Sequence, residues 1–192
     1  SGAAATPSRT DYRGITLRDW RPIAGCGEAG SIAPDPKNPG IVYGEAVGRF
    51  DFTTLQEQSI DPTLAYPGEY RRTWTLPLIF SPRDPKTLYF SNQFVFRTVD
   101  EGRHWAKISP DLSREAPAVP PNLDAVAAAN SAVAGARRGV VYTIAPSPLR
   151  DGLLWAGTDD GLVWITRDEG AHWTNVTPRE LTPWSKVGIL EA

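Results

Sequence analysis

Two octapeptides contain side chains whose types and spacing could do chemistry. "TVDEGRHW" (Thr98–Trp105) and "TRDEGAHW" (Thr166–Trp173) each combine an aspartate, a glutamate and a histidine, and together they contain both histidines of the chain. A zinc site would need further nitrogen or sulfur ligands, but the single cysteine, Cys26, is distant in sequence. The chain also has no G-x-S-x-G segment of the kind that many serine hydrolases use. We therefore expect neither a metal site nor a cofactor.

The shared pattern, T-x-D-x-G-x-x-W, instead predicts a tight turn between two strands. An aspartate at the reversal can accept backbone N–H bonds, and the glycine permits a positive φ that most residues resist. The tryptophan then begins the return strand and buries a large ring. The residues assigned to this structural role are Thr98, Asp100, Gly102 and Trp105 in the first copy and Thr166, Asp168, Gly170 and Trp173 in the second.

Composition limits the classes of partner. A chain of 192 residues that is 41% apolar can bury a sizeable core within one domain. Its net charge of −2 lacks the basic surface that nucleic-acid binding requires, and no apolar run approaches the ~20 residues that span a bilayer. We therefore expect no nucleic-acid partner and no membrane insertion. The absence of methionine predicts a processed or excised piece of a longer protein.

A four-strand unit recurs about three times along the sequence. Its clearest copy contains "VVYTIAPSP", "LLWAGT", "LVWITR" and "HWTNVTP", and "TLYFSN", "FVFRTV" and "HWAKISP" repeat three of these segments earlier in the chain. The 17 glycines and 18 prolines, with little helical periodicity, also favour short strands and turns. The predicted boundaries, within a single partial domain of residues 1–192, are a blade-ending strand at 15–24, blade one at 28–61, blade two at 73–110, a linker insertion at 111–138, blade three at 139–178 and the first strand of a following blade at 184–192.

Repeats of this length with four strands each are typical of β-propellers, whose closed rings contain about 4–8 blades. The predicted fold class is therefore all-β, with about three four-stranded blades and a ring that one chain leaves incomplete. Open blade faces would expose apolar surface to water. We expect the chain to be either a homo-oligomer or a fragment of a larger propeller.

The T-x-D-x-G-x-x-W pattern resembles the Asp-box, or BNR repeat, of sialidases, sortilin-type propellers and xyloglucan-active glycosidases. The stretches "GEAGSIAPDPKNPGIVYGE", "LPLIFSPRDPKTLYFSNQFVFRTVDEGRHWAKISPDLSRE" and "LLWAGTDDGLVWITRDEGAHWTNVTP" look like consecutive segments of the bacterial proteins called sortilin-like or BNR-repeat glycosyl hydrolases. This resemblance implies an Asp-box β-propeller in which the boxes are structural and lie away from the ligand. We expect an extracellular or periplasmic location.

The propeller topology predicts where a ligand site would lie. The connections between blades, and the turns between the second and third strands of each blade, share one face around the central channel. The residues that this topology places at the inner-strand entrances are Glu28, Arg71, Arg72, Trp74, Arg137, Arg138 and Lys186, and those on the neighbouring turns are Glu45, Asn92, Gln93, Asp159 and Asp160. Arginine, carboxylate and tryptophan side chains together suit a sugar or an acidic ligand. The alternative interpretation is solvated loop charge and ion pairs between blades.

Two classes of function stay open. The first is a non-catalytic or catalytically incomplete propeller segment that presents a carbohydrate- or protein-binding face. The second is a glycoside hydrolase, which needs two carboxylates facing each other across the scissile bond. Glu28 and Asp159 are the best candidates for such a pair, completed by missing blades or a second chain.

Two further segments have a structural alternative. "GCGEAG" (Gly25–Gly30) matches the spelling of a dinucleotide-binding motif, but prolines follow it where that motif needs a helix. Asn122–Ala136 could form a short helix capped at Asn122 or an irregular loop between blades. Neither segment changes the two functional alternatives.

Overall fold

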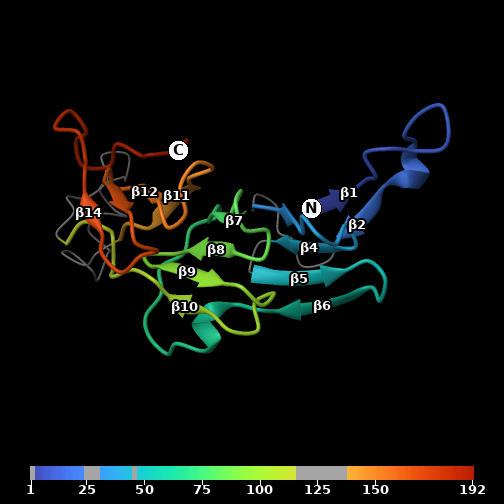
Figure 1. Ribbon diagram of the computed structural model, residues 1–192, viewed down its shortest axis with the longest axis horizontal. Helices are drawn as coiled ribbons and strands as arrows, with labels where there is room; N and C mark the ends of the chain where they lie inside the picture. The colour runs from blue at the N-terminus through green and yellow to red at the C-terminus, as the bar shows by residue number, and fades with distance from the viewer. Residues whose placement is uncertain (1–2, 24–30, 45–46, 116–137) are drawn as a thin grey trace, which may run out of the picture.

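The computed structural model describes residues 3–23, 31–44, 47–115 and 138–192 (Figure 1). Within these ranges the chain is all-β, as predicted, with short 3-10 helices such as η1 (Leu17–Asp19) and η3 (Pro62–Leu64). No helix in this part of the chain is long and apolar enough to cross a membrane. The predicted sites and segments that lie outside the described residues are Glu28, Glu45, Arg137, Gly25–Gly30 and Asn122–Ala136.

Three four-stranded antiparallel sheets follow one another along the chain. Blade one consists of β3 (Ala33–Pro34), β4 (Ile41–Gly44), β5 (Gly48–Asp51) and β6 (Gln56–Ser59), blade two of β7 (Leu78–Phe80), β8 (Leu88–Ser91), β9 (Val95–Thr98) and β10 (Ala106–Lys107), and blade three of β11 (Val141–Pro146), β12 (Leu154–Thr158), β13 (Val163–Thr166) and β14 (Thr174–Asn175). A two-stranded sheet of β1 (Ala3–Ala5) and β2 (Arg21–Ile23) precedes them. In Figure 1 this sheet and blade three lie at opposite ends of the molecule. The prediction of about three four-stranded, propeller-like blades is confirmed.

Side chains that alternate along each strand join neighbouring blades into continuous cores. In β8, Phe90 packs into the core between blades one and two, whereas the adjacent Tyr89 packs into the core between blades two and three. In β4, Tyr43 faces blade two and Val42 packs with residues of the β1–β2 sheet. Successive side chains of a strand point to opposite faces of its sheet. One apolar strand therefore contributes to two separate cores.

Both ends of the domain differ in detail from the sequence prediction. The strand expected at 15–24 is shorter, because Thr16 and Asp19 cap η1 and leave only Arg21–Ile23 for β2. This strand pairs with β1, which the sequence analysis does not predict. Residues 184–192 form no strand, although the sequence predicts the start of a following blade there. Val187 donates its N–H to the carbonyl of Thr158, but the residues after it make no backbone hydrogen bond to the described chain.

Each T-x-D-x-G-x-x-W turn is closed by its own side chains. In the first turn, the Thr98 hydroxyl donates to Asp100 Oδ1 at 2.9 Å and accepts the N–H of Gly102 at 3.0 Å. Asp100 also accepts the N–H of His104 at 2.9 Å, and its second oxygen lies 2.6 Å from His104 Nδ1. The second turn repeats these four contacts with distances that differ by at most 0.1 Å. The carboxylate and the imidazole of each turn therefore bind each other and the turn's own backbone.

The tryptophan of each turn binds to the preceding blade. Trp105 Nε1 donates to the carbonyl of Ile60, which follows β6, at 2.7 Å. Trp173 Nε1 donates to the carbonyl of Ile108, which follows β10, at 2.8 Å. An indole N–H that enters a core needs such a partner. Each ring therefore both fills an interblade core and fixes the end of the neighbouring blade.

The glutamate of each turn also reaches the preceding blade. Glu101 pairs with Arg49 of β5 at 3.2 Å, and Glu169 pairs with Arg97 of β9 at 2.7 Å. Arg49 and Arg97 hold the same place in their blades, because each lies opposite a tyrosine of the second strand. The same ion pair thus recurs at both interblade contacts.

Acid is expected to weaken these turns. Burial opposes the ionisation of Asp100, but hydrogen bonds from His104 and Thr98 outweigh it and lower its pKa from 3.8 to about 2. Bonds from the equivalent histidine and threonine lower the pKa of Asp168 to about 2 as well. A folded-state pKa below the unfolded value means that the ionised form stabilises the fold. This contribution is fully present above about pH 4 and is lost as the pH falls to about 2.

Denaturant unfolding at about pH 5 and at about pH 2.5 tests this expectation. The double variant Asp100→Asn/Asp168→Asn should lose less stability between these two pH values than the parent chain. An equal loss in both proteins would show that other carboxylates cause the acid sensitivity.

Candidate functional site

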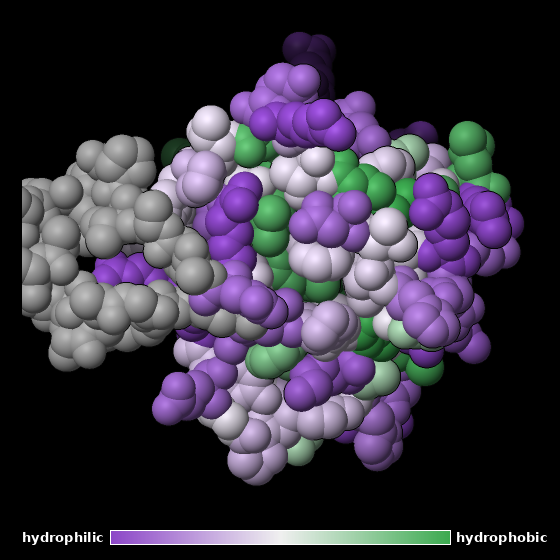
Figure 2. Space-filling view, turned by 90° about the vertical axis from the view of Figure 1, so that its left-hand side faces the viewer, coloured by the Kyte–Doolittle hydropathy of each residue, from purple (hydrophilic) through white to green (hydrophobic). Residues whose placement is uncertain are grey.

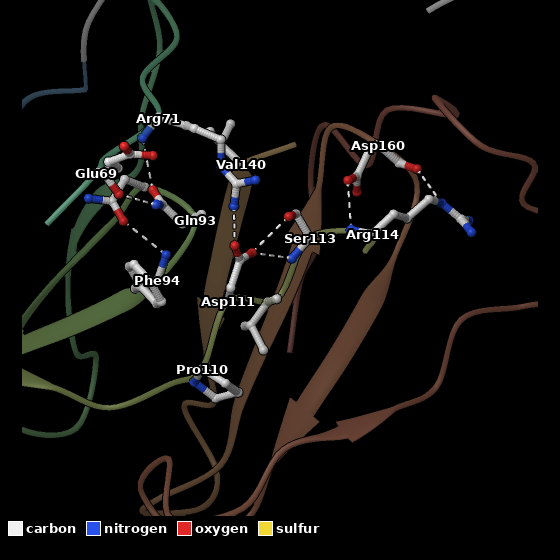
Figure 3. Close-up of polar contacts among 12 residues, drawn as sticks. Glu69, Arg71, Gln93, Phe94, Pro110, Asp111, Ser113, Arg114, Val140 and Asp160 are labelled. Carbon is white, nitrogen blue, oxygen red and sulfur yellow. Dashed lines mark hydrogen bonds and ion pairs between the residues drawn. The ribbon is translucent and has the colours of Figure 1, made fainter. Parts of the chain in front are cut away.

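The connections between blades meet the turns between second and third strands on one face (Figure 3), as the propeller topology predicts. Gln93, in the β8–β9 turn, donates from Nε2 to the carbonyl of Glu69 and accepts the N–H of Arg71 on Oε1. Asp159, in the β12–β13 turn, accepts the N–H of Val140 on Oδ1 at 2.8 Å. We call the surface around these five residues the channel face.

Two adjacent arginines that the sequence assigns to ligand binding form ion pairs at the exits of two different blades. Arg71 pairs with Asp111, which follows β10, and Arg72 pairs with Asp61, which follows β6. The Arg71 and Asp111 side chains are mostly buried, and Arg72 is more exposed. Arg71 and Arg72 both lie in the connection between β6 and β7, so each guanidinium group pairs with a carboxylate of a connecting segment.

The two aspartates at the blade exits sit in the same local structure. Asp61 Oδ1 accepts the N–H and the hydroxyl of Thr63 at 2.8 and 2.7 Å. Asp111 Oδ1 accepts the N–H and the hydroxyl of Ser113 at 3.0 and 2.7 Å. Each aspartate is followed two residues later by a hydroxyl residue, and the two side chains together close a turn. Asp61 and Asp111 are not among the predicted site residues, although this repeated D-x-[ST] pattern is a sequence signal for them.

A second polar contact joins the segment after blade two to blade three. The buried carboxylate of Asp160 accepts the Thr158 hydroxyl on Oδ1 and the N–H of Arg114 on Oδ2, the latter at 2.8 Å. The Arg114 guanidinium donates to the carbonyls of Asp160 and Gly161 at 2.7 and 3.0 Å. A Cβ on Gly139 would lie 1.9 Å from Asp160 Oδ2. Only glycine therefore permits this close approach, and the Asp160 carboxylate is not open to a ligand.

The first residues of the expected linker insertion at 111–138 belong to the folded body. Leu112 is fully buried in the core between blades two and three. Its N–H donates to the carbonyl of Gln93 at 3.1 Å, and its carbonyl accepts the Trp164 indole N–H at 2.8 Å. The sequence predicts that Leu112 lies in the linker insertion at 111–138. Its apolar side chain completes a core between blades instead.

The carboxyl group of Asp159 has a shifted pKa, and the ammonium group of Lys186 is one of the charges that affect it. Burial raises the pKa of the Asp159 carboxyl, and the neighbouring Asp160 charge adds to this rise, whereas the Val140 N–H and the Lys186 charge lower it. Lys186 Nζ also lies 4.2 Å from the centre of the Tyr142 ring, within range of a cation–π contact. A carboxyl group, an ammonium group and an aromatic ring therefore come together beside the entrance to β11.

The remaining predicted residues differ in exposure. Trp74 follows the paired arginines in the connection to blade two and is 71% exposed. Asn92 is buried, and its side-chain oxygen accepts the N–H of Phe94 at 2.9 Å. Arg138 is partly buried and precedes β11. Of these residues, only Trp74 offers a large open surface.

The opposite face contains the T-x-D-x-G-x-x-W turns, as the topology predicts. A cavity of ≈ 280 Å³ lies there between blades one and two, and Asp35, Pro85 and Asp100 are among its lining residues. Asp35 accepts two backbone N–H groups within its own turn. Asp35 and Asp100 thus each hold a turn on this face.

Comparison with known proteins adds a partial structural likeness. No protein-family model and no curated protein sequence matches the chain. Among solved structures, the chain is similar to a GH74 xyloglucanase from Xanthomonas campestris, with 18% sequence identity and a TM-score of 0.44. The similarity covers 89% of this chain and 25% of the xyloglucanase. The chain thus spans about a quarter of the length of that protein.

Proposed function

We propose that the chain is a segment of a BNR-repeat (Asp-box) β-propeller whose channel face binds a carbohydrate or protein ligand without turning it over. The two T-x-D-x-G-x-x-W turns support the Asp-box assignment, because their threonine, aspartate, glycine and tryptophan all make scaffold contacts. The observation that carries the binding proposal is Trp74, which is exposed and follows two arginines in the chain that are already paired. An exposed indole offers a flat, partly apolar surface on which a sugar ring can stack.

Replacing Trp74 with alanine is expected to weaken carbohydrate binding by roughly tenfold or more, which corresponds to about 1.4 kcal/mol. Calorimetric titration with cellohexaose, a neutral probe, and with trigalacturonic acid, an acidic probe, measures the effect. Trp20→Ala removes another exposed indole, which directly precedes β2, and is the matched control. Binding that survives Trp74→Ala, or that Trp20→Ala weakens equally, would contradict a site at Trp74. No binding of either sugar at millimolar concentration would leave only a protein ligand.

The alternative function is glycoside hydrolysis, and one observation favours it. The raised pKa of Asp159 is a property of the general acids that protonate leaving groups. Its proposed partner is Glu28, which lies outside the described residues. Turnover of a panel of aryl glycosides that Asp159→Asn abolishes and Asp11→Asn preserves would establish this alternative. We expect no turnover that depends on Asp159.

Two further expectations from the sequence stay predictions. One is the extracellular or periplasmic location, and the other is the association of chains into a larger ring.

A further inference from the structure

The two interfaces between four-stranded blades each enclose a groove on the face that contains the T-x-D-x-G-x-x-W turns. The groove between blades two and three has a volume of ≈ 290 Å³, and the groove between blades one and two has a volume of ≈ 280 Å³. Figure 2 looks onto the end of the molecule that blade three forms, where apolar side chains gather in the middle of the face. The groove between blades one and two lies away from this end (Figure 1), with a complete blade on either side.

The turn between the first and second strands is built in the same way in all three blades. Asp35, Ser81 and Ser147 each donate their N–H to the carbonyl of the residue six positions later. Each of these side chains also accepts the N–H of the residue two positions later. The turns can therefore be aligned residue by residue. The equivalent residues are Lys37 and Arg83 at the second position after these residues, Pro85 and Asp151 at the fourth, and Lys86 and Gly152 at the fifth.

The groove between blades two and three is closed by an ion pair of the protein's own. Arg83 of blade two donates from Nε to Asp151 Oδ1 of blade three and from Nη2 to Asp151 Oδ2, the latter at 3.2 Å. A guanidinium group that binds both oxygens of a carboxylate forms one of the stronger ion pairs. Arg97 and Glu169 form a second pair in the same groove. Its opposite charges thus bind each other.

The groove between blades one and two lacks the closing carboxylate. Lys37 has the place of the arginine, but Pro85 has the place of the aspartate. Two further cations, Lys86 and Arg103, line this groove where blade three has a glycine and an alanine. Among the residues that the structure describes, no ion pair joins any of these three cations to a carboxylate. Three positive groups therefore surround one cavity without a partner of their own.

The carboxylates around this groove are bonded elsewhere. Glu101 pairs with Arg49 at 3.2 Å. Asp35 accepts two backbone N–H groups of its own turn, and Asp100 accepts one. The neighbouring Asp84 accepts a threonine hydroxyl at 2.7 Å and an N–H at 3.1 Å, and these bonds lower its pKa. A ligand is thus the natural source of the missing carboxylate.

The walls of the groove limit the kind of ligand that could supply it. Phe80 and Val99 line the groove with apolar surface, and Val99 is 54% exposed. The N–H groups of Lys37 and Asn38 are already bonded to Asp35, so they are not open to the backbone of a peptide. A sugar ring needs no backbone partner, because its apolar face can pack on such a wall while its carboxylate binds the cations. These features favour an acidic sugar.

We propose that the groove between blades one and two binds the carboxylate of a uronic acid residue, which takes the place that Asp151 has in the next groove. The three cations bind the carboxylate, and the sugar ring lies against Phe80 and Val99. This site is separate from the ligand binding proposed for the channel face, because it lies on the opposite face and does not use Trp74.

Isothermal titration calorimetry with galacturonic acid tests the proposal, in the Trp74→Ala background so that the channel face does not contribute. We expect binding of galacturonic acid and none of galactose, its uncharged counterpart. Pro85→Asp should abolish binding, because the new carboxylate would bind Lys37 as Asp151 binds Arg83. Pro85→Asn, the uncharged control, should keep the affinity. Binding that survives Pro85→Asp, or that both variants abolish while still folded by thermal melt, would overturn the proposal.

The double variant Lys37→Gln/Lys86→Gln tests the role of the cations. It should weaken galacturonate binding by roughly tenfold, since each exposed charge contributes a modest amount. Lys107→Gln removes an exposed lysine of β10 outside the groove and should leave the affinity unchanged. Hexaglutamate that binds as tightly as galacturonic acid would overturn the assignment to a sugar and favour an acidic peptide. The proposal would also be overturned if no galacturonate binding were detected at millimolar concentration.

Discussion

Replacing Trp105 with alanine is expected to lower the free energy of unfolding by about 3–5 kcal/mol, the usual cost of deleting a large buried aromatic side chain. The ring is buried against Phe90 in the core between blades one and two, and its indole N–H holds the Ile60 carbonyl. Its loss leaves both a cavity and an unsatisfied carbonyl. Trp173→Ala should cost an amount near the lower end of this range, because that ring is only partly buried. Denaturant titration measures both values.

Trp105→Phe separates the two contributions, since it keeps most of the ring and removes the hydrogen bond. Its expected cost is about 1 kcal/mol from the bond, plus a smaller packing loss. Trp74→Ala, at an exposed site, serves as the control and should change the stability little. A Trp105→Ala protein as stable as the parent would mean that the turn does not hold the blades together.

Gly170→Ala is expected to destabilise the chain by about 1–3 kcal/mol, for two separate reasons. Gly170 has φ +95°, a region that alanine rarely adopts. An added Cβ would also lie 2.4 Å from the carbonyl oxygen of Ile108, the same carbonyl that accepts the Trp173 indole. Gly102→Ala should behave similarly, because its φ is +83° and its added Cβ would lie 2.4 Å from Ile60 Cδ1.

Gly188→Ala provides the matched control for the glycine substitutions. Nothing lies within 4 Å of the position of its added Cβ, so its stability should stay close to that of the parent in the same denaturant titration. Equal stabilities of the Gly170→Ala and Gly188→Ala proteins would contradict the tight approach of the turn to blade two.

The strands could be predicted from the sequence because each blade repeats its local signals. The turn residues of T-x-D-x-G-x-x-W act within eight residues, so their geometry depends little on the rest of the chain. The β1 strand could not be predicted, because three consecutive alanines have no strand preference of their own. They form a strand only because β2 pairs with them.

The candidate site was harder to predict, because it depends on which charges meet across blades. Composition and topology placed Arg71 and Arg72 on the channel face, but not their pairing with Asp111 and Asp61, which lie 40 and 11 residues away. Leu112 was missed because a single apolar residue in a polar connection has no periodicity. Residues of this kind are identified by what they contact in three dimensions.

The backward reach of the T-x-D-x-G-x-x-W turns has a consequence for biosynthesis. The Ile60 carbonyl accepts its hydrogen bond from a tryptophan 45 residues further along the chain, and the Ile108 carbonyl accepts one from a tryptophan 65 residues further. At a translation rate of about 5–20 residues per second, each of these carbonyls lacks its tryptophan partner for roughly 2–13 s after the last strand of its blade has been made. During this interval the nascent chain exposes the apolar face of an unfinished blade to water.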